Sequence, residues 1–298
     1  MTIQQLECML AVFRHGSISK AAASLFIAQS NLSTMLRNVE EELDFTVFVR
    51  TNKGIQPTEQ GMLFLRHAAS LCEEYHQMLD ACKQTNYLKF RMSGTYYAPV
   101  YDSFTKLCQH YADQPQLDFS YQVLPYSAAL DKLCFAELDL AVLLISPDSL
   151  SNFKHTAKEK NLSLQVLGQI PIVLRIGPSH PLYRCPEIRL ADFQNYTYVD
   201  YPRSSVLDNP QVRDLVPIRS ERMVHVSSSE LRKQLISQST MYCVGCKLPS
   251  TLNKQYSFRN IPLGDIHYLL ITLTRKSEAQ SSAVRNYITC LSDELQDL

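Results

Sequence analysis

The sequence predicts an α+β multidomain protein, with a small helical head, one long helix and a larger α/β region. Two observations support this class. Residues 1–87 carry apolar side chains at helical spacing almost throughout, whereas residues 88–298 alternate strand-like and helix-like segments. A chain of 298 residues is also long enough for two or three domains.

The first 58 residues have the pattern of three helices followed by a hairpin. Thr2 can cap a first helix that Gly16 ends, and a short alanine-rich helix covers Lys20 to Leu25. A third helix is expected from about Gln29 to Leu43, and two extended segments, 45–50 and 55–57, flank a tight turn. This order predicts a winged helix-turn-helix over residues 1–58.

A long helix is expected from Thr58 to about Tyr87, as a linker over residues 59–87. Its apolar residues alternate by three and four positions, and they are Leu65, Ala68, Cys72, Tyr75, Leu79 and Cys82. Such a stripe is suited to pairing with another helix. We therefore expect self-association, as a homodimer or a homotetramer, and the stripe does not decide between the two because it supports pairing only. The alternative is that the stripe packs on its own chain.

Residues 88–298 begin with two strand–helix–strand units, which predict a parallel sheet. Their strands are expected at 88–92, 117–124 and 138–145. Residues 147–161 are polar and look like a loop. Further strands are expected at 170–176, 196–201, 222–226, 241–246 and 266–274, with helices at 229–237 and 278–295.

Composition excludes several classes of protein. No apolar run approaches the ~20 residues that span a bilayer, and no signal peptide is apparent, so we expect a cytoplasmic protein without membrane contact. Nine irregularly spaced cysteines do not suggest a secreted disulfide framework. Cys243 and Cys246 lie too far apart for a disulfide if they share a strand. We expect no metal, no cofactor and no enzymatic activity, although a redox role for these two cysteines stays open.

The third helix carries the strongest functional signal. Opposite its apolar stripe it presents short polar side chains suited to base edges in the major groove of double-stranded DNA, together with one arginine. The candidate base-contacting residues are Gln29, Ser30, Asn31, Ser33, Thr34 and Arg37. Arg50 and Lys53 flank the hairpin tip and can contact phosphates.

Charge predicts weak binding to non-specific DNA. Residues 1–66 contain as many acidic as basic side chains, and the whole chain has 29 of each. Phosphate contacts are the main sequence-independent source of affinity, so we expect the protein to need two or more heads on one site.

The order of residues in the head resembles the LysR-type transcriptional regulator family. The resemblance runs without gaps over about sixty residues and rests on 21–25, Gln29, 32–33, Arg37, 40–43, Phe48, 50–51, Gly54 and 57–61. Looser landmarks follow at 137–141, 180–182, 190–193 and 244–245. The resemblance implies a periplasmic-binding-protein-like effector domain over residues 88–298. Its subdomain I would comprise 88–165 and 267–298, and its subdomain II 166–266.

In such folds a ligand binds at the carboxyl ends of strands, where helix N-termini present free N–H groups. The residues at those ends are Thr95, Tyr96, Tyr126, Ser127 and Ser146 in one subdomain and Asp200, Tyr201 and Ser204 in the other. Hydroxyl and N–H groups suit a carboxylate or another small anion, and we therefore expect a small-molecule effector of that kind.

The function that follows is sequence-specific transcription regulation of LysR type, controlled by a small molecule bound between two α/β subdomains. The alternative is a small-molecule-binding protein whose helix-turn-helix head serves mainly oligomerisation. The neutral head, and Ala28 where a capping hydroxyl is common, motivate that alternative. The sequence does not indicate the effector, the operator, or whether the protein activates or represses.

Overall fold

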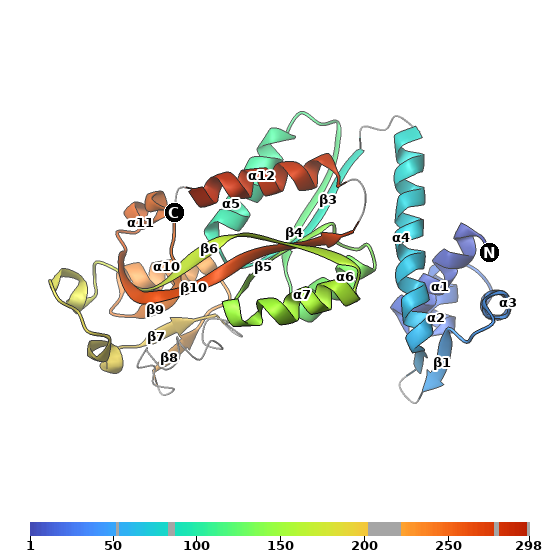
Figure 1. The fold of residues 1–298 in the computed structure, drawn as a ribbon, viewed down its shortest axis with the longest axis horizontal. Helices are drawn as coiled ribbons and strands as arrows, with labels where there is room; N and C mark the ends of the chain where they lie inside the picture. Colours follow the sequence, from blue (N-terminus) through green and yellow to red (C-terminus); the bar gives the residue numbers. More distant parts are fainter. Residues whose placement is uncertain (52–53, 83–86, 202–221, 277–279, 297–298) are drawn as a thin grey trace. The chain divides into compact units, whose positions relative to one another are not determined.

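The structure is a computed structural model that describes residues 1–51, 54–82, 87–201, 222–276 and 280–296 (Figure 1). The chain forms two compact units, which are described separately below. One unit comprises Met1–Arg91, Gln114–Asp118 and Ser127–Asp139. The other comprises Met92–Asp113, Phe119–Tyr126 and Leu140–Leu298.

The head has the predicted winged helix-turn-helix. Its elements are α1 (Ile3–His15), α2 (Ile18–Ser24), α3 (Gln29–Leu43), β1 (Phe48–Thr51) and β2 (Gly54–Pro57). Thr2 caps α1 through a capping box and Gly16 ends it in the left-handed conformation, as expected. The hairpin returns to this turn, because the Ile55 N–H donates to the Gly16 carbonyl at 3.0 Å. A Cβ at Gly54 would lie 2.7 Å from the same carbonyl, so only glycine fits there.

The long helix α4 (Glu59–Cys82) buries the first half of its predicted stripe within its own chain. Leu65, Ala68 and Cys72 are buried, and α4 contacts α1. The expectation that this stripe pairs with a second chain is therefore wrong for these three residues, since they are already buried within their own chain. Several apolar side chains of α4 are exposed, namely Tyr75 of the stripe and, outside it, Leu63, Leu71 and Met78.

The α/β region contains one mixed eight-stranded sheet with the order β4-β3-β5-β10-β6-β9-β7-β8. Its first strands are β3 (Tyr87–Gly94), β4 (Gln116–Val123) and β5 (Leu140–Ile145), and its other short strands are β7 (Tyr198–Asp200), β8 (Met223–His225) and β9 (Tyr242–Cys246). The predicted parallel pairing holds for β3 with β5, and β7 is parallel to both β8 and β9.

Two long antiparallel strands, β6 (Leu162–Ile176) and β10 (Arg259–Arg275), join the two groups of short strands. β10 pairs with β5 through residues 269–273, and β6 pairs with β9 through residues 172–176. Both strands are longer than the sequence predicted. The register between them shifts at Pro262/His267 and at Leu270/Ile271, so the ribbon is irregular where it passes from one group to the other.

Helices flank the sheet (Figure 1). They are α5 (Ala98–His110), α6 (Tyr126–Cys134), α7 (Leu150–Glu159), α10 (Ser229–Gln238), α11 (Ser250–Gln255) and α12 (Ser282–Gln296), with 3-10 turns η1 (Pro147–Ser149), η2 (Pro181–Arg184) and η3 (Leu190–Asn195). α5 and α12 pack side by side. The expected loop at 147–161 is mostly helix α7, because Leu150, Phe153 and Ala157 form a short apolar stripe at helical spacing.

Candidate functional site

Helix α3 occupies the predicted span, and its ends have unusual caps. Ala28 stands at the N-cap and supplies no side-chain hydrogen bond, so the first N–H groups of α3 stay available for an outside acceptor. At the other end Asp44 adopts the left-handed conformation with φ 58°, a position that glycine fills at lower cost. The apolar residues Leu32, Leu36 and Val39 are buried, which fixes the opposite face outward.

The predicted DNA-contacting side chains lie on that outer face. All are exposed except Ser33, which is half-buried, and the exposed set is Gln29, Ser30, Asn31, Thr34, Arg37 and Arg50. Two of them already have partners within the head. The Ser19 hydroxyl donates to Gln29 Oε1 at 2.9 Å, and the Thr34 hydroxyl donates to the Ser30 carbonyl at 3.0 Å. Lys53 lies outside the described residues.

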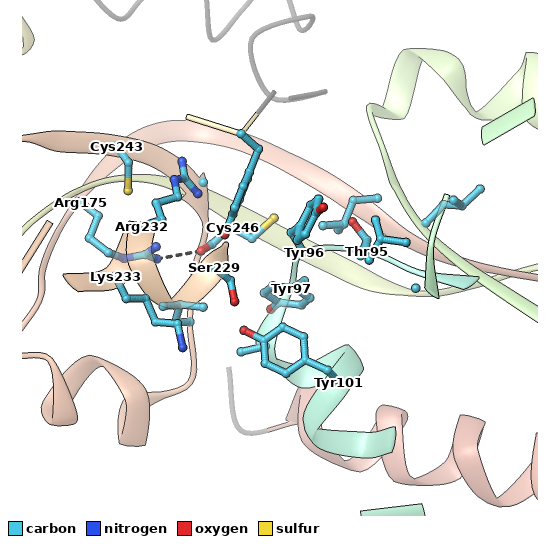
Figure 2. A pocket seen from close by; sticks show the side chains of 18 of the residues that line it. Thr95, Tyr96, Tyr97, Tyr101, Arg175, Ser229, Arg232, Lys233, Cys243 and Cys246 are labelled. Atoms are coloured by element: carbon cyan, nitrogen blue, oxygen red, sulfur yellow. Dashed lines mark hydrogen bonds between the residues drawn. The ribbon is translucent and has the colours of Figure 1, made fainter. Parts of the chain in front are cut away.

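A cavity of about 540 Å³ lies in the α/β unit, between the end of β3 and the β6–β9–α10 region (Figure 2). Its walls come from loops after β3, β4 and β7, from the first turns of α5 and α10, and from β5, β6 and β9. The volume is within the range of small-molecule sites, which is roughly 300–1,000 Å³.

Four of the predicted effector residues line this cavity, namely Thr95, Tyr96, Tyr126 and Tyr201. Three others lie outside the lining. Ser127 is inside α6, and the Ser146 hydroxyl shares a hydrogen bond of 2.8 Å with Ser149. Asp200 is 1% exposed, and its Oδ1 accepts from the Tyr201 N–H at 2.8 Å. Ser204 lies outside the described residues.

The structure adds cationic residues that the sequence reasoning missed. Arg175 in β6 and Arg232 and Lys233 in α10 line the cavity, and Ser229 joins them from the first turn of α10 (Figure 2). One signal for Arg175 was present, because it interrupts the apolar run 170–176 of a buried strand. A charge in such a run rarely stays buried without a specific reason.

The two arginines have different surroundings. Arg232 lies with its Nη2 3.7 Å from Asp200 Oδ1 and 2.8 Å from the Val244 carbonyl oxygen. Burial opposes its charge, but neighbouring groups that include Asp200 outweigh burial and raise the pKa of Arg232. Arg175 donates to Asn260 Oδ1 at 3.0 Å and to the Cys246 carbonyl at 2.8 Å. Burial, reinforced by the Arg232 charge, lowers the pKa of Arg175.

Cys243 and Cys246 are free thiols in β9, as the strand prediction required. Burial raises the pKa of Cys246 to about 12 despite the nearby arginines, so its thiolate is scarce at neutral pH. Among the described residues no group of three or more His, Cys, Asp or Glu side chains is placed to hold a metal ion. The described helices include none that is both long and apolar enough to cross a bilayer.

Comparison with known proteins identifies the class. The profile described as "Bacterial regulatory helix-turn-helix protein, lysR family" matches residues 3–62, and the profile "LysR substrate binding domain" matches residues 104–296. Together they cover the head and most of the α/β region. The chain belongs to the LysR family of bacterial transcription regulators, in which a helix-turn-helix DNA-binding domain precedes an effector-binding domain.

Curated relatives and a solved structure agree with this assignment. A "Probable RuBisCO transcriptional regulator" of Phaeodactylum tricornutum is 23% identical over 100% of this chain and 97% of that protein. One from Cyanidium caldarium is 26% identical over 69% of this chain and 64% of that protein, which is slightly under two thirds of its length. The crystal structure of ArgP from Mycobacterium tuberculosis has the same fold, with a TM-score of 0.67 at 15% identity over 99% of this chain and 97% of that one.

Proposed function

We propose that α3 and the β1–β2 hairpin bind operator DNA and that a small molecule in the 540 Å³ cavity controls this binding. The observation that carries the proposal is the position of the cavity. Its lining comes from both groups of strands that β6 and β10 join, and from the first turns of α5 and α10. A ligand that contacts both groups can favour one arrangement of them over another, which is the requirement for a population shift.

The domain limits stay as the sequence suggested. The head comprises 1–58, the linker 59–87 and the effector domain 88–298, with subdomain II at 166–266. Support comes from the long strands, because the limits at 165/166 and 266/267 fall within β6 and β10. A bend in this two-stranded ribbon would change how the two groups of strands face each other, and the irregular register near residue 266 is a suitable place for it.

For DNA recognition we assign base contacts to Gln29, Ser30, Asn31, Ser33, Thr34 and Arg37, with phosphate contacts from Arg50 and Lys53. Support comes from the exposure of this face of α3 and from the uncapped N–H groups at its start, which suit a phosphate. A cytoplasmic location follows from access to the chromosome.

Self-association completes the proposal. The head carries little net charge, so one head alone gains little affinity from phosphates. The exposed apolar set on α4, namely Leu63, Leu71, Tyr75 and Met78, supports pairing of two α4 helices in a homodimer. Further contacts between effector domains would give a homotetramer.

The experiment compares Ser33→Ala and Arg37→Ala with the control Arg184→Ala, which removes an exposed cation from η2 in the effector unit. DNA is selected by the full chain from a random-sequence pool, and its binding is measured by gel shift. We expect each α3 variant to weaken the selected complex about tenfold or more and the control to leave it unchanged.

If the chain selects no sequence, or if the α3 variants bind as the parent does, DNA recognition by α3 is wrong. The second candidate function, a binding protein whose head serves oligomerisation, would then be favoured. It predicts that deletion of residues 1–58 changes the oligomeric state without changing ligand affinity.

A further inference from the structure

We infer that the effector is an organic anion with a flat, unsaturated body, and that its acidic group binds the guanidinium of Arg175. This inference rests on the proposed function, since it takes the cavity to be the effector site. The proposed class is narrower than any small anion. The position of the acidic group also differs from the sequence-based expectation: the acidic group of the ligand contacts a residue of strand β6, whereas the sequence suggested the N-termini of helices.

The positive charge of Arg175 is not balanced by any described carboxylate. The residue is 5% exposed, and no carboxylate among the described residues forms an ion pair with it. Its observed partners are a neutral amide, Asn260, and the Cys246 carbonyl, and its guanidinium lies 5.5 Å from the centre of the Phe258 ring. A buried cation without a counter-charge is costly, and an incoming anion would remove that cost.

Arg232 lines the same cavity but has different partners from Arg175. Arg232 is 9% exposed and has its counter-charge within the protein, because Asp200 lies 3.7 Å away. It also donates to two backbone carbonyls, those of Val199 and Val244. Arg232 therefore has a carboxylate partner, whereas among the described residues Arg175 has only neutral hydrogen-bond acceptors. Since no described carboxylate balances Arg175, we assign that role to the acidic group of the ligand.

The described charged side chains that line the cavity are all cationic. Three cations line it, and its described lining includes no aspartate and no glutamate. Lys233 pairs with Glu230 at 3.0 Å, but Glu230 is exposed and outside the lining, so Lys233 can turn toward a bound acid. A neutral or cationic ligand would leave the charge of Arg175 without a carboxylate partner among the described residues.

The body of the ligand follows from the rest of the lining. Six aromatic residues contribute, namely Tyr96, Tyr97, Tyr101, Tyr126, Tyr201 and Phe258. In Figure 2 Arg175 and Lys233 lie on one side of the cavity, Thr95, Tyr97 and Tyr101 lie on the other, and Ser229 lies between them. Aromatic faces favour a flat, unsaturated group through stacking and edge contacts. An acid bound to Arg175 therefore directs such a body toward the tyrosines.

The experiment is a calorimetric and thermal-shift titration of the full chain in Tris buffer free of phosphate and sulfate. The probes are benzoate, phenylacetate and cinnamate, each beside its primary amide, with hexanoate as a flexible acid. We expect at least one aromatic acid to bind at least tenfold more tightly than its amide and than hexanoate, a difference of ~1.4 kcal/mol.

Three variants test whether the acidic group of the ligand binds Arg175. Arg175→Met should bind the acid and the amide equally, and Arg175→Lys should keep a preference for the acid because it keeps the charge. Arg184→Met, which removes an exposed cation outside the cavity, should behave as the parent. If Arg175→Met does not fold, the comparison of acid with amide on the parent protein still decides whether the ligand is an anion, and the affinity of Arg175→Lys for the acid, compared with that of Arg184→Met, tests its position.

Several outcomes would overturn the inference. They are acids and amides of equal affinity, an Arg175→Met variant that keeps the preference for the acid, or failure of every acid to bind at millimolar concentration. Selection of DNA by the same preparation separates these outcomes from failure of the proposed function. Specific DNA binding without binding of acids refutes the ligand class alone, whereas loss of both refutes the regulator.

Discussion

The ring of Tyr96 stacks on the ring of Tyr201, with centroids 4.5 Å apart and 14° between their planes. Tyr96 follows β3 and Tyr201 follows β7, so the stack joins strand ends that lie far apart in the sheet order. The Arg232 guanidinium lies 4.5 Å from the centre of the Tyr201 ring and holds it from another direction. The stack is therefore a direct link across the 540 Å³ cavity.

Tyr96 and Tyr201 should be energetically coupled. Tyr96→Leu and Tyr201→Leu should together destabilise the protein by less than the sum of the single effects, with a coupling of about 0.5–1.5 kcal/mol. Urea denaturation of the parent, the two single variants and the double variant measures this cycle. Strict additivity would mean that the stack contributes nothing beyond the burial of each ring.

Stability should fall in mild acid because of His180. Burial lowers the pKa of His180 from 6.5 to about 4 in the folded protein, so the unfolded chain takes up the proton more readily. The stability that the protein gains from keeping His180 neutral is complete above pH 6.5. It is lost as the pH falls from 6.5 toward 4. We expect a loss of about 3 kcal/mol over this window, measured by urea denaturation at a series of pH values.

His180→Asn tests the origin of that loss. An asparagine oxygen can replace His180 Nδ1, which accepts from the Leu182 N–H at 3.1 Å, but it does not titrate. The variant should show a flatter pH profile than the parent. His225→Asn, which alters an exposed histidine, should keep the parent's profile. Equal slopes for the parent and His180→Asn would assign the acid sensitivity to other groups.

Glu40 should stabilise the junction between α3 and the hairpin. Its Oε1 accepts the N–H groups of Val47 at 2.7 Å and of Phe48 at 2.9 Å. Glu40→Ala leaves both donors without this partner and should cost about 2 kcal/mol. Amide hydrogen exchange of residues 45–51 measures this locally, without interference from the effector unit.

Two further variants complete that comparison. Glu40→Gln keeps an acceptor oxygen and should lose less than the alanine variant does. Glu41→Ala removes an exposed carboxylate next in sequence and should change protection by no more than about 0.5 kcal/mol. Equal protection in all three variants would show that Glu40 has no special role.

Binding to random DNA should be weak. The head has equal numbers of acidic and basic side chains, so few counterions are released on binding. In a gel-shift titration at about 0.2 M salt we expect no complex with random duplex DNA at protein concentrations that shift the selected site. A random-DNA complex of similar strength would show that other cations, outside the first 66 residues, dominate the contact.

Local patterns in the sequence predicted the head well. Thr2, Gly16 and the apolar spacing of Leu32, Leu36 and Val39 act within one or two turns of helix, so α1 and α3 have the predicted limits. The stripe on α4 shows where this reasoning stops. Periodicity indicates which side of a helix is covered, but it does not say by what. Leu65 is buried within its own chain, in a helix that contacts α1.

The effector cavity depended on tertiary structure. Thr95, Tyr96, Tyr126 and Tyr201 could be placed from the rule that ligands lie at strand ends, because that rule uses only the order of elements. Arg175 could not, since it lies in the middle of a paired strand and lines the cavity only because β6 runs past β9. The sequence alone determined the class of protein, the fold of its head and the order of the strands along the chain. All of these depend on residues that are close together in the sequence. Only folding decided which cation has a carboxylate partner among the described residues, because a counter-charge such as Asp200 for Arg232 comes from residues distant along the chain.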